Sequence, residues 1–448
     1  MRPAPIPPFR SPSLKLRFPR PCSLAGRGLQ LSLAARVPAG SQPVWGTDRA
    51  EPAFLRFPPA CPMPASPALP PDLAWAVDPL PRVTSAWPGC GGRLKGSPED
   101  FVVEEIPAYR PEGSGEFLYL WVEKRGLAAE QLVSHLARML QISHQDIGVA
   151  GLKDRHAITR QFVSIPAKCE SRLCAVDHPQ ITVLDTGRHR NKLRPGHLRG
   201  NRFSIVIRDV EPAGLERVQS IAQQVALHGG ANYFGEQRFG RDFETLILGW
   251  DLLRGTRGPH DIPRARRKFL HRLALSSVQS ALFNVWLADR LRSGRLHQLQ
   301  VGDAMQVSAS GGPFVVEEVA REQPRYDSHE TVLAGPIFGP KMKDAQGEAR
   351  AEEDRLLARA GLTRDSFIRY PHLTSGTRRP AVIWPEGLTI EPVDASSLRA
   401  TFTLPAGCYA TVLLRELMGD ATTEVTSPLA GTPEEETGGE ESAMDNDA

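Results

Sequence analysis

The sequence predicts a protein of mixed strands and helices, in which a helix-rich segment separates two strand-rich parts. Short runs of β-branched and aromatic residues between turn residues predict strands on both sides of that segment. Apolar residues at helical spacing predict long helices within it. With 448 residues, the chain is long enough for two or three domains of ordinary size.

The first strand-rich part is expected to begin near residue 73. Residues 117–123 form an apolar run typical of a buried strand, and residues 128–140 place Leu132, Leu136 and Leu140 on one helical face. Further strands are predicted over residues 161–165, 181–184 and 203–207, with a helix over 215–228 that Gly229 and Gly230 end.

The middle of the chain is predicted to be an inserted domain. Residues 269–292 carry apolar side chains at helical spacing, and residues 349–360 have charges on the face opposite their apolar one. Strand-like runs at 388–393 and 398–404, followed by residues 409–418, would return the chain to its first domain. We therefore predict a first part at 73–231, an insertion at 232–380 and a return at 381–420.

Both ends of the chain have the composition of disordered segments. Residues 1–72 are rich in Pro, Arg, Ala and Ser without periodicity, and residues 421–448 form an acidic tail. Residues 1–47 carry seven Lys or Arg and no acid, whereas residues 431–448 carry seven acids and no base. The start could be an organelle transit peptide, a basic arm for RNA, or an upstream extension of a protein that begins at Met63; we favour the last.

Composition excludes several classes of protein. The net charge is +3, and because the two ends cancel, any surface for nucleic acid must be a local patch. Six cysteines without a Cys-x-x-Cys pair suggest neither a disulfide framework nor a metal site. No run of about 18 apolar residues suggests a membrane span. We expect a cytoplasmic protein, or an organellar one if residues 1–62 are a genuine transit peptide.

The most informative segment is residues 151–161, GLKDRHAITRQ, which follows a short apolar run. It contains one carboxylate, Asp154, on a predicted loop between strands, where reactive groups usually lie. Its sequence neighbours include the cations Lys153, Arg155, His156 and Arg160. We expect these positive charges to keep the carboxylate ionised, so that it could act as a nucleophile. The alternative is a solvated turn with an ordinary salt bridge.

This segment resembles the signature of the TruD family of pseudouridine synthases. Four other segments resemble further blocks of the family and occur in the family's order, and the resemblance extends over residues 73–418. These segments are 95–101 (KGSPEDF), 201–203 (NRF), 232–240 (NYFGEQRFG) and 404–410 (LPAGCYA).

The resemblance implies a fold and an activity. The fold is an α+β pseudouridine-synthase catalytic domain with a mixed, largely antiparallel sheet, interrupted by an inserted TruD-specific α+β domain. The activity is that of an isomerase that converts uridine to pseudouridine in tRNA, at position 13, without a cofactor or metal. Asp154 takes the place of the family's catalytic Asp, either as nucleophile on the sugar carbon or as base for a sugar proton. No protein partner is evident, and we expect a monomer.

The resemblance also implies residues that hold the substrate. Lys95 matches a basic active-site residue, Phe101 and Phe203 match aromatic residues of the pocket, and Asn201 could orient Asp154 or hydrogen-bond the uracil. Tyr409 departs from the Phe that the family commonly has, which puts the polarity of the pocket in doubt. Without the resemblance, the two Phe would be ordinary core residues, Lys95 a surface lysine and Asn201 a turn residue.

The densest basic run of the body precedes Asn201 in the sequence. We predict that it contacts RNA phosphates, although such a run is often only a solvated face. Residues 264–268 could form the opposite wall of an RNA cleft. Two other functions remain open: the same chemistry on another RNA, and non-catalytic RNA binding. The predicted RNA-binding residues are Arg188, Arg190, Lys192, Arg194 and Arg199.

Overall fold

The structure, a computed structural model, describes residues 70–420. The predicted acidic tail and all but the last three residues of the predicted N-terminal extension lie outside the described residues, as does Met63. None of the helices in the described range is long and apolar enough to cross a bilayer.

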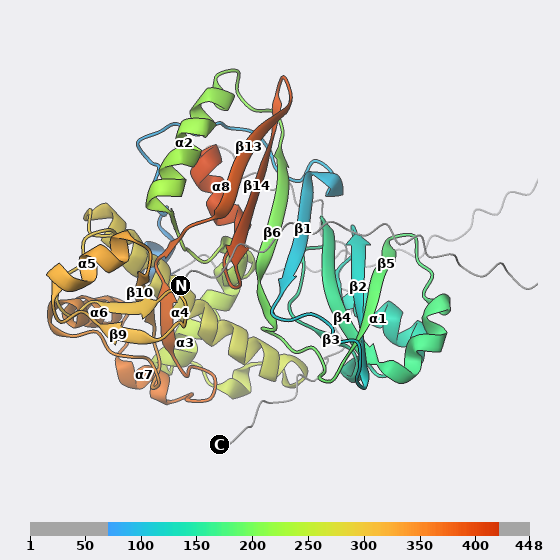
Figure 1. The fold of residues 1–448 in the computed structure, drawn as a ribbon. Helices are drawn as coiled ribbons and strands as arrows, with labels where there is room; N and C mark the ends of the chain where they lie inside the picture. Colours follow the sequence, from blue (N-terminus) through green and yellow to red (C-terminus); the bar gives the residue numbers. More distant parts are fainter. Residues whose placement is uncertain (1–69, 421–448) are drawn as a thin grey trace, which may run out of the picture. The chain divides into compact units, whose positions relative to one another are not determined.

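Strands from both strand-rich parts of the chain build one sheet (Figure 1). Its order is β13-β14-β6-β1-β4-β2-β5, with β3 paired to β4. Among these strands only β1 and β4 run parallel, which confirms the α+β class and the mixed, largely antiparallel sheet. The strands are β1 (Phe101–Pro107), β2 (Phe117–Arg125), β3 (Gly148–Val149), β4 (Ile158–Pro166), β5 (Ile181–His189), β6 (Leu198–Ile207), β13 (Glu386–Asp394) and β14 (Ser397–Pro405).

Three helices cover this sheet. In α1 (Ala129–Leu140), the predicted apolar face is fully buried against β2 and β4. In the other half of the sheet, α2 (Gly214–His228) and α8 (Ala410–Met418) pack over β13 and β14 (Figure 1). α2 ends where predicted, because Gly229 takes a positive φ of 72° that a side chain would disfavour.

The middle of the chain forms a second sheet and a second core. α4 (Arg267–Arg292) is buried on nearly every side from Ala274 to Ala288, which is more than a one-sided helix would show. The four-stranded sheet has the order β11-β10-β8-β9. The remaining elements of this part are α3 (Glu244–Arg254), β8 (Ala304–Val307), β9 (Pro313–Val315), α5 (Val319–Asp327), β10 (Thr331–Ile337), α6 (Gly347–Arg359), α7 (Arg364–Ile368) and β11 (Thr377–Pro380).

A short antiparallel ladder lies where the chain passes between the two sheets. β7 (Gly230–Ala231) pairs with β12 (Val382–Ile383), so the chain enters and leaves the second sheet region side by side. The first described turn, Pro71–Val77, packs with Leu73 and Ala76 against the core around α4 rather than against the large sheet. This contact was not foreseen, because residues 73–231 were predicted to form one part.

Short 3₁₀ turns connect several of these elements. One of them, Glu236–Phe239, matters below because its successive residues face different cavities. The others are Pro98–Asp100, His144–Asp146, Ala167–Ala175, Arg241–Phe243, Pro259–Asp261 and Arg264–Arg266.

Gly200 on β6 permits a close approach between strands. A β-carbon at this position would lie 2.2 Å from the carbonyl oxygen of Leu404 on β14. The register of β1 against β6 shifts at this point, so Gly200 also lies at a bulge. The residue that follows it is Asn201, one of the predicted substrate-binding residues.

We expect Gly200→Ala to lower the free energy of unfolding by about 1–3 kcal/mol, because a backbone carbonyl cannot move aside as a side chain can. Urea unfolding measures the change. Gly258→Ala is the control, because a β-carbon there meets only a carboxylate oxygen at 4.0 Å. Equal stability of the two variants would contradict the close approach.

Candidate active site

Asp154 lies on the loop between β3 and β4, with its side chain 48% exposed. The Nζ atom of Lys95 lies 4.0 Å from its Oδ1 atom. Lys124 of β2, a fully buried lysine, hydrogen-bonds the backbone of this loop. Its Nζ donates to the carbonyl oxygens of Leu127 and Asp154, each at 2.7 Å. The carboxylate is therefore accessible on a loop whose backbone is fixed.

Two of the cations that adjoin Asp154 in sequence, Lys153 and Arg160, pair with other groups. Lys153 turns inward, with its Nζ 3.1 Å from Oε2 of Glu105 and 2.9 Å from Oδ1 of Asn201. Arg160 points along β4 and pairs with carboxylates of the neighbouring strands β1 and β2. The expected cluster of sequence neighbours is thus wrong in detail, and the cation that faces Asp154 comes from residue 95 instead.

The six predicted catalytic and substrate-binding residues line one cavity of about 200 Å³. They come from the turn before β1, from β1 and β6, from the Asp154 loop, and from the residue before α8. Sheet order explains the gathering, because β6 and β1 are neighbours and β4 follows. The lining residues are Lys95, Phe101, Val103, Leu152, Lys153, Asp154, Asn201, Phe203, Gln237, Cys408, Tyr409, Ala410 and Thr411.

The aromatic residues of this cavity belong to the core as well. Phe101 and Phe203 are almost completely buried and meet edge to face, with ring centroids 6.5 Å apart. Phe203 also stacks on Phe402 of β14 at 5.3 Å. Tyr409 is half-buried, and its hydroxyl is not among the buried groups that lack a hydrogen-bond partner. The added oxygen is therefore not trapped in an apolar wall.

Sequence reasoning missed the buried ion pair of Lys153 and Glu105, whose side chains are 5% and 0% exposed. A signal was present, because Glu105 follows Phe101 and Val103 at a period of two and so falls on the buried face of β1. Burial raises the pKa of Glu105, and the charge of Lys153 opposes that rise. Gln237, which reaches the cavity from the turn Glu236–Phe239, was also missed.

The predicted basic run is divided by the fold. Arg188 on β5 pairs with Glu170, and Arg190 pairs with Glu112. β5 lies four strand spacings from β6, or about 19 Å. Nζ of Lys192 donates to the backbone oxygen of Gln145.

The remaining two residues of the run have no such neutralising partner. Arg194 and Arg199 are exposed and form no ion pair with another described residue, and Arg199 lies on the same strand as Asn201. Within residues 70–420, no three His, Cys, Asp or Glu side chains gather as a metal site.

The sequence profile of tRNA pseudouridine synthase D (TruD) matches residues 82–258 and 257–417. The chain belongs to the TruD family. It is 43% identical over 338 residues to the tRNA pseudouridine synthase D of Anaeromyxobacter dehalogenans. That match covers 75% of this chain and 96% of the relative. The Thermus thermophilus protein of the same name is 40% identical over 353 residues. That match covers 78% of this chain and 94% of the Thermus protein.

A solved structure shows the same fold. The crystal structure of a Methanosarcina mazei protein described as a tRNA pseudouridine synthase D superposes with a TM-score of 0.61 at 24% identity, over 77% of this chain and 96% of that one. The sequence profile and the curated relatives confirm the predicted family and the enzyme class, a tRNA-modifying isomerase.

Lys124 should make the free energy of unfolding depend on pH. Burial lowers its pKa to about 8, although the charges of Asp154 and Glu130 oppose this shift and that of Lys153 adds to it. The unfolded chain keeps this proton up to about pH 10.4, so between pH 8 and 10.4 unfolding takes up a proton. The free energy of unfolding should therefore rise with pH in this window, by up to about 1.4 kcal/mol per unit from this group.

We expect Lys124→Met to lose this rise. Urea titrations between pH 7 and 9.5 would compare it with the unchanged chain and with Lys168→Met, which removes an exposed lysine. Parallel pH profiles for Lys124→Met and the unchanged chain would contradict the lowered pKa.

Proposed function

We propose that this chain converts uridine to pseudouridine in tRNA, at position 13, with Asp154 as the catalytic group. The observation that carries the proposal is that Asp154 is the one carboxylate among the residues lining the cavity, which also include aromatic, amide and lysine side chains. Its volume of about 200 Å³ lies below the range usual for small-molecule sites, about 300–1,000 Å³. That size suits one extruded base better than a larger ligand.

The reaction breaks the C–N glycosidic bond and rejoins the same uracil through carbon, so no atoms are gained or lost overall. An ionised carboxylate beside the ribose can assist in two ways. It can attack the sugar carbon, or it can remove a sugar proton so that a glycal forms. The exposed side chain of Asp154 on a fixed loop is suited to either step. In the first route the bond between Asp154 and the sugar forms as the glycosidic bond breaks, and it breaks again when C5 of the uracil joins the sugar. In the second route the proton taken by Asp154 returns to the sugar as the bond from C5 forms. In both routes C5 loses a hydrogen and N1 gains one, so the atoms balance without a cofactor.

The other side chains of the cavity would bind and orient the uridine. The rings of Phe203 and Tyr409 offer faces for the uracil, and stacking of this kind contributes about 1–3 kcal/mol per base. The amide of Asn201, held by Lys153, would hydrogen-bond the base or ribose. Gln237, from the turn Glu236–Phe239, offers a second amide.

Lys95 supports the assignment by its backbone. Its φ of 60° lies in the left-handed region, which costs a non-glycine residue about 1–3 kcal/mol. In this conformation its Nζ lies 4.7 Å from the centre of the Phe101 ring and within reach of Asp154. Strain of this kind is typically retained where it positions a functional group.

We extend the proposal to the domain organisation. A pseudouridine-synthase catalytic domain would comprise residues 73–231 and 381–420, and the TruD-specific domain residues 232–380. The separate sheets and the ladder of β7 with β12 support this division. We propose that the protein acts in the cytoplasm, as a monomer.

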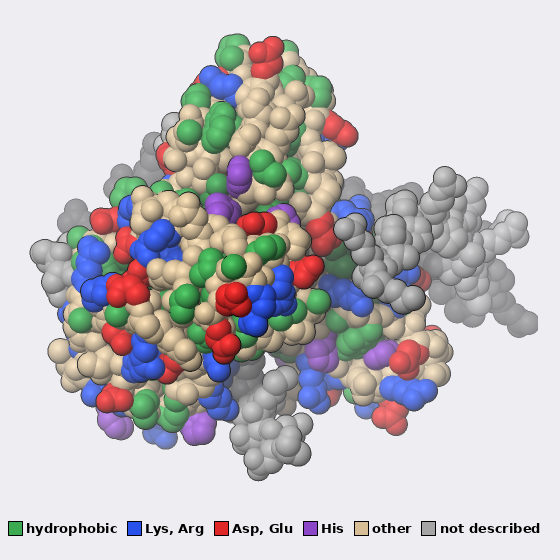
Figure 2. Space-filling model, turned by 60° about the vertical axis from the view of Figure 1, so that its left-hand side comes forward, with side chains coloured by type: hydrophobic (Ala, Val, Ile, Leu, Met, Phe, Trp, Pro, Cys, Tyr) green, Lys and Arg blue, Asp and Glu red, His purple; other side chains and the backbone are tan. Residues whose placement is uncertain are grey.

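RNA would approach the cavity from the β6 side. Figure 2 shows the face that carries the second sheet region, where basic and acidic side chains alternate and form no broad surface of one sign. Ion pairs such as Arg350 with Asp344 and Arg355 with Glu348 account for this mixture. Arg194 and Arg199, which have no such partners, are better placed to contact phosphates.

Asp154→Asn should reduce turnover by on the order of 10⁴-fold, because the amide keeps the size of the side chain but can act neither as nucleophile nor as base. Tritium release from labelled uridine in tRNA measures turnover, and a binding titration measures affinity, which should change little. Asp185→Asn, an exposed change on β5, is the control. Retained turnover in Asp154→Asn would exclude a catalytic role.

A paired comparison tests the RNA path. Arg194→Ala with Arg199→Ala should lower the slope of log affinity against log salt concentration by about two, because each lost phosphate contact removes about one. Arg188→Ala with Arg190→Ala removes two arginines that carboxylates already neutralise, so its slope should change by less than about one. The opposite ranking would place the RNA at the β5 edge.

A further inference from the structure

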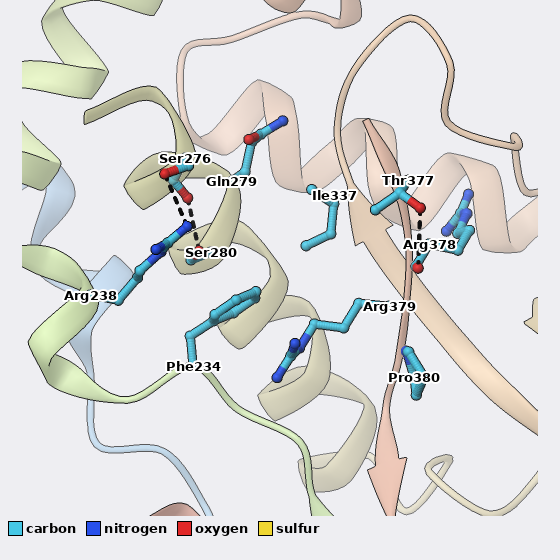
Figure 3. Close-up of a pocket in the computed structure, with 10 residues that line it drawn as sticks. All are labelled: Phe234, Arg238, Ser276, Gln279, Ser280, Ile337, Thr377, Arg378, Arg379 and Pro380. Atoms are coloured by element: carbon cyan, nitrogen blue, oxygen red, sulfur yellow. Dashed lines mark hydrogen bonds between the residues drawn. The ribbon is translucent and has the colours of Figure 1, made fainter. Parts of the chain in front are cut away.

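The described chain contains a second cavity beside the one around Asp154. Its volume is about 300 Å³, and it lies between the turn Glu236–Phe239, α4 and β11 (Figure 3). None of its lining residues is acidic, whereas three are arginines. They are Phe234, Arg238, Ser276, Gln279, Ser280, Ile337, Thr377, Arg378, Arg379 and Pro380.

The positive charge of this cavity is only partly balanced. Arg378 is neutralised by Glu353 of α6 in an ion pair whose closest nitrogen and oxygen are 2.5 Å apart. Both side chains of the pair are buried, at 1% exposure each. Arg238 and Arg379 form no ion pair with any residue in the range 70–420. Two guanidinium charges therefore remain on the wall of one cavity.

The two unbalanced arginines face the cavity from opposite sides of Phe234 (Figure 3). Arg379 lies over the Phe234 ring at 4.1 Å and donates to the backbone and side-chain oxygens of Asn232. Arg238 donates to Oγ of Ser276 at 3.1 Å, but its Nε is buried and has no partner. A buried N–H without an acceptor is costly, particularly on a cation.

The second cavity shares a wall with the first. Gln237 lines the cavity of Asp154, whereas Arg238, the next residue, lines the second. The Phe234 ring meets the Tyr409 ring edge to face at 6.2 Å. Arg379 donates to the carbonyl of Gly407, two residues before Tyr409. The two cavities are therefore neighbours.

We propose that this second cavity binds a phosphodiester group of the RNA, adjacent to the uridine that occupies the cavity of Asp154. This inference rests on the proposed function, since it takes RNA as the substrate. A phosphate offers several acceptor oxygens and a negative charge, and guanidinium groups bind it through charge-assisted, often bidentate hydrogen bonds. It would satisfy the free Nε of Arg238 and offset both charges. Burial lowers the pKa of Arg379; Cys408 and Tyr409 oppose this shift, and the charge of Arg238 adds to it.

The contact gives the inserted segment a role in placing the substrate. Holding one phosphate beside the flipped nucleotide would fix the RNA backbone next to the cavity of Asp154, so that the ribose is presented to the carboxylate in one orientation. Arg238 is thus a positioning residue of the substrate, and not a member of the reacting centre.

The test replaces single phosphates in the RNA by neutral methylphosphonates, on the 5′ or the 3′ side of the target uridine. All proteins are full-length and carry Asp154→Asn, so that the RNA is not converted during titration. The parent is the protein that carries Asp154→Asn alone. At one of the two positions the methylphosphonate should lower its RNA affinity about 10-fold, the effect of one charge-assisted hydrogen bond. Arg238→Gln should bind the unmodified RNA about 10-fold more weakly and lose nothing further with the methylphosphonate.

Further variants keep the test decisive. Arg238→Lys retains the charge and should retain most of the coupling to the phosphate. Ser276→Phe fills the cavity from α4 and should abolish the coupling even if Arg238→Gln proves unstable in a thermal melt. Arg355→Gln, an exposed arginine that lines neither cavity, should behave as the parent does.

Two outcomes overturn the proposal. In the first, Arg238→Gln and the methylphosphonate each weaken RNA affinity, and their fold-losses multiply at both the 5′ and the 3′ position. That result would show that no phosphate occupies the cavity. Coupling of Arg238 to an abasic substitution, rather than to a methylphosphonate, would place a base there. Failure of the proposed function is distinct, because the unmutated chain would then fail to bind tRNA or to release tritium from it.

Discussion

Two buried lysines hold the loop that carries Asp154, and the geometry of the candidate site depends on them. Lys124 of β2 fixes the carbonyl of Asp154 itself. Lys153 is tied to Glu105 of β1 and Asn201 of β6. A buried ammonium group is stable only where acceptors or a carboxylate surround it, so each lysine permits few loop conformations. The carboxylate is consequently exposed to a substrate while its backbone is attached to three strands of the sheet.

The sheet supplies these attachments because of its strand order. β6, β1, β4 and β2 are successive neighbours, so residues far apart in the sequence meet within a few strand spacings. The parallel pairing of β1 with β4 places the start of β4, and thus the Asp154 loop, beside the start of β1. Lys95 and Phe101 lie there as well. The aromatic walls serve two purposes, since Phe101 and Phe203 complete the core below and line the cavity above.

The second sheet region contributes through one short turn. Within Glu236–Phe239, Gln237 faces the cavity of Asp154 and Arg238 faces the other, because successive residues of a tight turn point in different directions. The distinctive sequence of residues 232–240 thereby contributes to the walls of both cavities. It is itself anchored to α4, since the Asn284 side chain bonds both the N–H and the carbonyl of Phe234.

Residue patterns alone were enough to predict most elements and the residue types that line the candidate site. Alternation and helical spacing correctly indicated β2, β4, β6, α1, α2 and α4, because these patterns record which face of each element is buried. The motif order also selected the residues that meet around Asp154. Which charges meet could not be predicted from these patterns, because ion pairs across a sheet depend on strand order and register. Lys153 therefore pairs with Glu105 instead of Asp154, and Arg188 is neutralised at a distant edge while Arg238 remains without a carboxylate.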